Sequence, residues 1–217
     1  MPKGSEALTN ARKEEIINAC ASLYETMSFK AITIRDIGAH TSFTRTSIYN
    51  YFQTKEEIFL ALLQREHEQW TADLQALIRQ HASLSAETFA DCLAHTLEKR
   101  SRMLKLMSMN LYEMEENSRL ENLVALKCAF ADALQAVEDC LIKFFPSMDA
   151  NDRQAVLYAF FPFLLGVYPY TSHTEKQLQA MQLAHMQAVP YSIFQLSQSF
   201  LIKILKPFDA QADDGRS

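Results

Sequence analysis

Apolar residues recur along most of this chain at intervals of three and four, which is the period of an amphipathic α-helix. The first such stretch covers residues 11–27, where Ile16, Cys20, Leu23 and Met27 fall on one face. The chain is therefore predicted to open with a helix whose apolar face closes a small core.

Longer segments with the same period follow. Thr54 and Glu57 are spaced as a capping box, and the segment 55–81 that they open contains neither Gly nor Pro. It is long enough to belong to two domains at once. Further helices are predicted from the turn at 83–85 to about 99, on to about 116, from a capping box at Ser118 and Glu121 to 144, over about 151–168 and over 191–206. Together these segments predict an all-α fold.

One apolar run stands apart, because residues 155–170 contain no charged side chain in sixteen positions. A membrane span is the alternative to a buried helix. The run falls short of the roughly 20 residues that a bilayer requires, and it contains Pro162 and Gly166. We therefore expect a helix buried on all sides, and a second subunit would supply one of its partners.

Two short helices separated by a tight turn are predicted within residues 33–59. Thr33 stands at the N-cap position of the first helix, and Asp36 completes a capping box three residues later. Thr44 can cap the second helix, which is expected over residues 45–51. This order is that of a helix-turn-helix, in which the second helix lies in the major groove of DNA.

The second helix carries two outward rows of side chains, Arg45 with Tyr49 and Thr46 with Asn50. Arg can donate two hydrogen bonds to guanine, Asn can pair with adenine, Thr can touch a thymine methyl and Tyr can reach a phosphate. We predict that Arg45, Thr46, Ser47 and Asn50 read bases, that Thr33, Tyr49, Tyr51 and Lys55 mainly hold phosphates, and that Thr44 completes the DNA-binding set.

The chain resembles the TetR family of bacterial transcriptional regulators in this region. The residues that carry the resemblance are Ile34, Asp36, Ile37, Phe43, Ile48, Tyr49, Phe52, Lys55, Glu56, Glu57 and Ile58. Two positions depart from the family pattern, since Ser28 and Ser42 stand where the family usually has Gly. A Ser in a left-handed conformation would cost on the order of 1 kcal/mol.

The resemblance implies an N-terminal three-helix DNA-binding domain followed by a C-terminal helical domain for ligand binding and dimerisation. It also implies a homodimer on a palindromic operator and a small-molecule effector; most such proteins are repressors released by their ligand. The predicted boundaries are 1–54 for the DNA-binding domain, 55–206 for the C-terminal domain and 207–217 for a tail. A helical bundle that only binds proteins is the alternative, and the base-reading residues argue against it.

The formal net charge is −5, but residues 1–55 carry +2 and the remainder −7. This asymmetry suits a small DNA-binding head on an acidic body, although so small a positive charge needs dimerisation to hold an operator.

The chain offers no pattern typical of an enzyme, a metal site or a cofactor site. Its four glycines form no phosphate-binding loop, and its six histidines never fall three or four apart. The four cysteines show no metal-binding spacing, so we expect all four to be buried in a reducing compartment, with a redox-sensing thiol as the minor alternative. The N-terminus has no apolar signal segment, which predicts a cytoplasmic protein without a membrane partner.

A Met-rich stretch around 103–114 is equally consistent with adaptable core packing and with a pocket for apolar ligands. We place a pocket for a largely apolar effector among Trp70, Phe89, Met103, Met107, Tyr112, Phe130 and Phe161. We place the dimer interface on the helices around 151–168 and 191–206, at Phe160, Leu164, Tyr168, Ile193, Leu196, Phe200 and Ile204.

Overall fold

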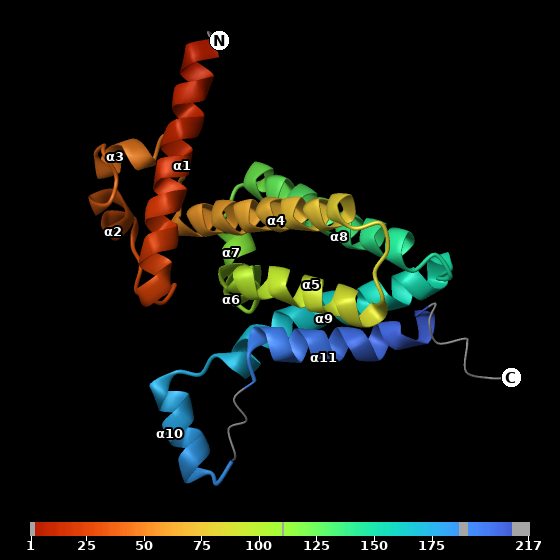
Figure 1. The fold of residues 1–217 in the computed structure, drawn as a ribbon. Helices are drawn as coiled ribbons and strands as arrows, with labels where there is room; N and C mark the ends of the chain where they lie inside the picture. The colour runs from red at the N-terminus through yellow and green to blue at the C-terminus, as the bar shows by residue number, and fades with distance from the viewer. Residues whose placement is uncertain (1–2, 110, 187–190, 210–217) are drawn as a thin grey trace, which may run out of the picture. The chain divides into compact units, whose positions relative to one another are not determined.

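The computed structural model describes residues 3–109, 111–186 and 191–209, and every element within these ranges is a helix (Figure 1). In chain order they are α1 (Lys3–Thr26), α2 (Ile34–Ala39), α3 (Arg45–Ile48), α4 (Lys55–Gln80), α5 (Ala86–Lys99), α6 (Ser101–Met107), α7 (Leu111–Glu116), α8 (Leu120–Phe144), α9 (Ala150–Thr171), α10 (Glu175–Leu183), α11 (Ile193–Leu205) and the 3-10 helix η1 (Lys206–Phe208). The all-α prediction is confirmed.

Several helix ends differ from the prediction, and the helix predicted up to about residue 116 is divided into α6 and α7. Helix α1 begins at Lys3 instead of residue 11, since no helix breaker follows Gly4. Helix α3 ends at Ile48 instead of residue 51, because the chain then turns more tightly. The amides of Asn50 and Tyr51 donate to the carbonyls three residues earlier, so residues 49–51 continue as turns.

The chain divides into two compact units that differ from the predicted domains. The first unit contains Met1–Glu66 and Asn110–Phe130, and the second contains His67–Met109 and Ala131–Ser217. Helices α4 and α8 each run through a unit boundary, so no linker marks the predicted limit at residue 54. The segment 110–130 belongs with the N-terminal helices, although residues 67–109 separate them in the sequence.

The core of the first unit is built from the apolar faces of α1, α2, α3 and the start of α4. Ile16 is fully buried, as the spacing of apolar residues in α1 predicted, and Ile37, Ile48 and Ile58 are fully buried as well. The ring of Phe59 meets two aromatic rings edge-on, with centroid distances of 5.2 Å to Tyr24 and 4.8 Å to Phe29. These contacts fix α4 against α1 and the loop that follows α1.

In the second unit, α11 packs against α5 and α9. Trp70 is fully buried there, and its indole N–H donates to the Thr96 hydroxyl at 3.0 Å. The rings of Phe160 and Phe161 both lie 6.3 Å from the Trp70 ring, measured between centroids. Helix α10 differs from its neighbours in having no buried residue, and Figure 1 shows it beyond the end of α9.

Two expectations about the cysteines and the apolar run can be compared with the structure. Cys20 and Cys140 are buried, and burial raises the pKa of Cys140 to about 12. The prediction that all four are buried is wrong, because Cys92 is half-buried and Cys128 lies on an exposed face of α8. Within the described ranges, no single helix is long and apolar enough to cross a membrane; α9 with α10 passes by length and composition only as a pair bent by 80°.

Candidate DNA-binding site

The helix that precedes the turn is capped as the sequence predicted. The Thr33 hydroxyl accepts from the Asp36 amide at 3.3 Å, and the Thr33 amide donates to the Asp36 carboxylate at 2.9 Å. The Thr33 hydroxyl also donates to that carboxylate at 2.6 Å. Hydrogen bonds from Thr33 lower the pKa of Asp36, so the box stays intact at neutral pH.

The turn between α2 and α3 is held by its own hydroxyls and by α1. The Thr41 hydroxyl lies 3.0 Å from the Gly38 carbonyl oxygen and 3.1 Å from that of Phe43. The Ser42 amide donates to the Glu15 carboxylate, and the Ser42 hydroxyl donates to it at 3.1 Å. Neither Ser28 nor Ser42 has a positive φ, since among the described non-glycine residues only His185 does. The turn therefore forms without the family's usual glycines and without left-handed strain.

Helices α2 and α3 approach each other closely at Gly38. A Cβ placed on Gly38 would lie 3.2 Å from the Arg45 Cβ and 3.3 Å from the Arg45 Cα. Because Gly38 has no side chain, the first turn of α3 can pack directly against α2.

Helix α3 divides its side chains between the core and solvent. Ile48 is fully buried, while Arg45 and Thr46 on α3 and Asn50 in the turn that follows are exposed, so a base edge could reach their polar groups and the Thr methyl. Tyr49 is 45% exposed, and its hydroxyl accepts from the Arg45 guanidinium at 3.4 Å. The predicted outward rows are therefore present in the structure.

Three other members of the predicted set have partners within the protein. Thr44 is exposed at the N-cap of α3 but makes no capping hydrogen bond; its hydroxyl lies 3.1 Å from that of the half-buried Ser47. The Lys55 ammonium donates to the carbonyls of Phe29 at 2.9 Å and Ile32 at 3.2 Å, and lies 4.3 Å from the Phe29 ring centroid. Lys55 thus has at most one N–H left for a phosphate.

The end of residues 45–51, called the recognition segment below, is held by a buried carboxylate. Glu57 is 1% exposed and accepts from the Gln53 amide at 2.7 Å. Arg119, at the start of α8, donates to Glu57 through Nε at 2.7 Å, Nη2 at 2.9 Å and its backbone amide at 3.1 Å. Arg119 Nη2 also donates to the Tyr51 carbonyl at 3.1 Å. Half-buried Tyr51 is therefore bound through its backbone.

The predicted capping boxes at Thr54 and Ser118 differ from the observed bonds. The Glu57 amide donates to the Thr54 hydroxyl at 3.2 Å, but the Glu57 carboxylate turns to Gln53 and Arg119. The Ser118 hydroxyl donates to the Met114 carbonyl at 2.7 Å, so α8 begins at Leu120. Burial alone would raise the pKa of Glu57, but hydrogen bonds from Arg119 and Gln53 outweigh it and the pKa is lowered.

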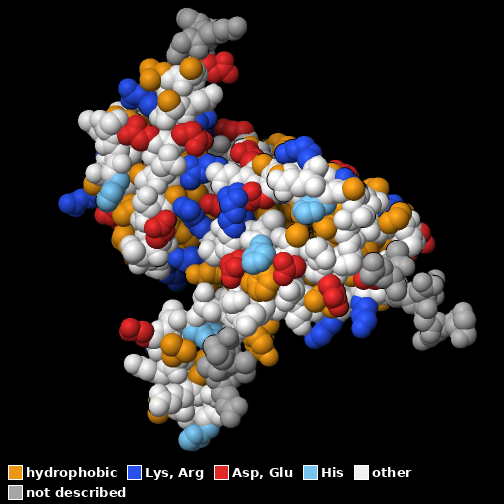
Figure 2. Space-filling model, in the orientation of Figure 1, with side chains coloured by type: hydrophobic (Ala, Val, Ile, Leu, Met, Phe, Trp, Pro, Cys, Tyr) orange, Lys and Arg blue, Asp and Glu red, His pale blue; other side chains and the backbone are white. Residues whose placement is uncertain are grey.

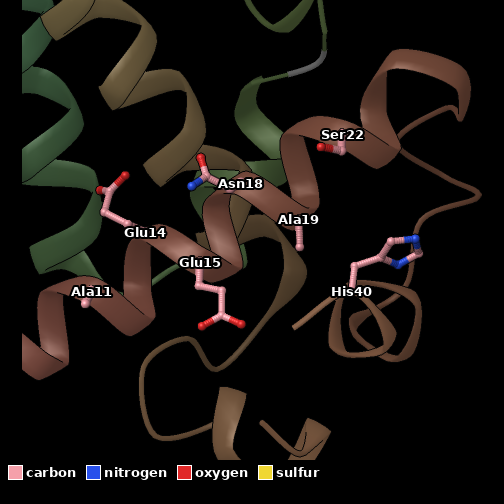
Figure 3. A pocket seen from close by; sticks show the side chains of 7 residues that line it. All are labelled: Ala11, Glu14, Glu15, Asn18, Ala19, Ser22 and His40. Carbon is pink, nitrogen blue, oxygen red and sulfur yellow. The ribbon is translucent and has the colours of Figure 1, made fainter. Parts of the chain in front are cut away.

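A cavity of about 380 Å³ lies beside α1 in the same unit (Figure 3). Its lining comes from α1 and from His40 at the end of α2, and it includes the carboxylates of Glu14 and Glu15. Two acidic side chains make this a poor place for a phosphate. Figure 2 also shows Lys and Arg side chains scattered among Asp and Glu on the face in view. The side chains on this face therefore form no broad basic patch.

Comparisons with known proteins agree with this geometry. Residues 16–62 match the family model described as bacterial regulatory proteins, tetR family, and residues 64–205 match the model described as tetracyclin repressor-like, C-terminal domain. The chain belongs to the TetR family. It is therefore a DNA-binding transcriptional regulator, and α3 is the recognition helix of its helix-turn-helix.

Solved structures share the fold of this TetR-family chain at low sequence identity. The fatty acid degradation regulator FadR from Bacillus halodurans has a TM-score of 0.58 and 14% identity, covering 89% of this chain and 94% of that one. The repressor AlkX from Dietzia sp. strain DQ12-45-1b has a TM-score of 0.52 and 12% identity, covering 90% and 94%. A putative transcriptional regulator from Streptomyces coelicolor A3(2) has a TM-score of 0.52 and 13% identity, covering 92% and 98%. A search of curated proteins finds no match.

The residues predicted to line the effector pocket are divided between the two compact units. Trp70 and Phe161 lie in contact, but Phe89 packs against Phe144 and Phe145, with ring centroids 5.6 Å and 5.5 Å away. Met103 and Met107 are buried in α6. Tyr112 is 79% exposed and, like the half-buried Phe130, belongs to the first unit. The regular spacing of apolar residues could not distinguish these separate clusters.

A cavity of about 650 Å³ in the second unit lies elsewhere. It is formed at the end of α9, along α10 and at the start of α11, and its surface is mostly apolar with a few polar side chains. The lining residues are Pro169, Tyr170, His173, Gln177, Ala180, Met181, Met186, Tyr191 and Leu196. Only Leu196 was among the predicted functional residues, and it was assigned to the dimer interface.

The residues predicted for the dimer interface fall into two groups. Phe160, Leu164 and Ile193 are buried within their own chain. Tyr168, Leu196, Phe200 and Ile204 are half-buried, and the Phe200 ring stacks on that of Phe163 at 4.2 Å. The face that α9 leaves exposed is a different one, and it consists of Ala155, Tyr158, Ala159, Pro162, Leu165 and Pro169.

Proposed function

We propose that this regulator is a homodimeric repressor, working in the cytoplasm, that holds a palindromic operator with two copies of α3. A small, largely apolar molecule bound by the C-terminal helices then releases it. The observation that carries the proposal is the exposed surface of α3 and the turn that follows it, where Arg45, Thr46 and Asn50 offer base-reading groups on a segment held before and after the helix.

Dimerisation is supported by the exposed face of α9. From Ala155 to Pro169 this face carries apolar or small residues and no charge, after the exposed amides of Asn151 and Gln154 in the first turns; Tyr158 is 71% exposed and Leu165 is 46% exposed. A continuous apolar face of this kind marks a surface that binds another protein. Because both copies present the same face, a two-fold axis along α9 and α11 would cover it.

A second copy is also needed for DNA affinity. Residues 1–55 carry a net charge of only +2, and the ammonium of Lys55 is largely used within the protein. Few phosphate contacts per head give weak binding, since affinity rises with the number of phosphates neutralised. Two heads on one dimer double that number.

Effector binding is supported by the cavity between α9, α10 and α11. Its largely apolar surface would take an apolar molecule, and Tyr170, His173 and Gln177 offer hydrogen bonds for a polar end. A ligand that prefers the conformation with wrongly spaced heads weakens operator binding by its difference in affinity for the two conformations.

A thermal-shift screen tests the effector. FadR is a regulator of fatty acid degradation and AlkX is a repressor implicated in biodegradation of n-alkanes, so long-chain fatty acids and alkanes are the first compounds to screen, beside aromatic ones. We expect apolar compounds to raise the melting temperature and to release DNA. Stabilisation by strongly charged, hydrophilic compounds alone would contradict an apolar effector.

The operator can be found by selecting from a random duplex DNA library with the full-length protein. Sequencing should give an inverted repeat whose half-sites lie about 34 Å apart, one helical turn, or a multiple of it. A protein that enriches no sequence from the library would contradict the proposed function.

A further inference from the structure

Residues 117–119 reach into the DNA-binding head from far along the chain. The Thr54 hydroxyl donates to the Asn117 carbonyl at 2.9 Å, and Arg119 binds both the Glu57 carboxylate and the Tyr51 carbonyl. All of these residues belong to the first compact unit. Hydrogen bonds at Tyr51 and Thr54 in the loop, and at Glu57 in the first turn of α4, therefore connect this region to residues 117–119.

These bonds satisfy backbone groups that the recognition segment cannot satisfy itself. The carbonyls at the end of a helical segment have no partner within it and need outside donors. The Tyr51 carbonyl receives one from Arg119, and the Gln53 amide finds its acceptor in Glu57. The Arg119 guanidinium thus acts on both sides of Phe52. It binds the Tyr51 carbonyl directly, and it holds the Glu57 carboxylate that accepts from the Gln53 amide.

The ion pair between Glu57 and Arg119 is reinforced by several hydrogen bonds. Glu57 is 1% exposed, so its negative charge depends on hydrogen bonds for stability. Arg119 supplies three of them, while its own side chain is 35% exposed. The guanidinium fork fits this geometry in a way that a Lys ammonium cannot, because two donors must reach the carboxylate together.

We propose that Arg119 is a positioning residue for DNA recognition, so that operator affinity depends on where the start of α8 lies. Arg119 immediately precedes Leu120, the first residue of α8, and a displacement of that end must move the guanidinium. The Tyr51 carbonyl then loses its donor, and α3 loses its fixed orientation. This inference rests on the proposed function, since it concerns the same base-reading surface.

The test compares Arg119→Lys and Glu57→Gln with the wild type as full-length proteins on the selected operator. We expect at least roughly tenfold weaker binding for both, because each variant disrupts hydrogen bonds to a charged group that orient the loop. Hydrogen exchange of the amides at 50–54 should become faster in both variants. Glu57→Gln keeps the shape of the side chain, so it remains informative if Arg119→Lys folds poorly.

Arg65→Lys is the matched control. Arg65 joins α4 to α1 through Glu14 at 3.1 Å and Asn18 at 2.6 Å in the same unit, but it does not touch residues 51–54. It should lower the melting temperature less than Arg119→Lys does, because Glu14 is exposed, and it should leave operator affinity within about twofold of the wild type. Unchanged affinity in both test variants, or an equal loss in Arg65→Lys, would overturn the positioning role. A wild-type protein that selects no DNA would instead overturn the proposed function itself.

Discussion

At the scale of single residues, Arg45 and Asn50 are the exposed side chains within residues 45–51 that can each make paired hydrogen bonds with a base. Lys55 lies close to them in the sequence and has another task, since its ammonium joins α4 to the end of the α1–α2 loop. Residue type alone did not distinguish these roles.

Changing Asn50 to Ala should cost about 1 to 3 kcal/mol of operator binding and relax preference at one base position in each half-site. Arg45→Ala should behave in the same way at a different position. Arg45→Lys keeps the charge but loses the paired donors, so it should weaken binding at that position too. Titrations on the selected operator and its single-base variants measure these effects; uniform weakening on all sequences would count against base reading.

Changing Lys55 to Met should reduce the free energy of unfolding by about 1 to 3 kcal/mol, because two partly buried carbonyls lose their donor. It should also weaken binding to all DNA sequences alike, with a salt slope that falls by less than one unit. Denaturant unfolding and binding at several salt concentrations check both effects. Lys13→Met, at an exposed site on α1, should leave the free energy of unfolding unchanged; an equal loss there would show that the Lys55 bonds add nothing.

At the scale of elements, local signals predicted most helices and long-range bonds were missed. The capping box of Thr33 and Asp36 could be predicted because its partners are three residues apart. The bonds from Glu15 to Ser42 and from Arg119 to Glu57 join residues 27 and 62 positions apart, and no spacing rule indicates them. The interface on α9 was placed imperfectly because that helix is apolar all round, so its pattern does not tell which face the chain covers itself.

The Glu57 network predicts how stability depends on pH. Its folded pKa lies below the ordinary value of 4.5, so the ionised carboxylate favours the folded state above that value. This contribution should be lost as the pH falls through the folded pKa. The free energy of unfolding of the wild type should therefore fall more steeply below pH 4.5 than that of Glu57→Gln. Parallel urea titrations across this range would reveal it, and identical pH profiles would contradict it.

At the scale of the whole molecule, two copies of the chain have to be held together, and the exposed face of α9 is the surface to test. Leu165→Asp places a charge at its centre on a residue that is 46% exposed in the single chain, so folding of the subunit should survive. We expect loss of dimerisation and of tight operator binding together. Sedimentation at micromolar concentration and operator titration provide the two measurements.

Val124→Asp is the matched control for Leu165→Asp, since Val124 is 52% exposed on α8 in the other compact unit. It should remain dimeric and bind the operator normally. If Leu165→Asp also stays dimeric, the α9 face is not the interface, and the half-buried residues of α11 become the next surface to change.

The place of residues 110–130 in the first unit has a consequence for protein engineering. The two family matches meet between residues 62 and 64, which invites the construction of hybrid regulators by joining one protein's N-terminal helices to another's C-terminal ones. A hybrid cut there would carry Glu57 and Tyr51 without the arginine that binds them. The compact unit that contains the DNA-binding helices is discontinuous in sequence. A working hybrid therefore has to include residues 117–119, or replace Glu57 with a side chain that needs no arginine partner.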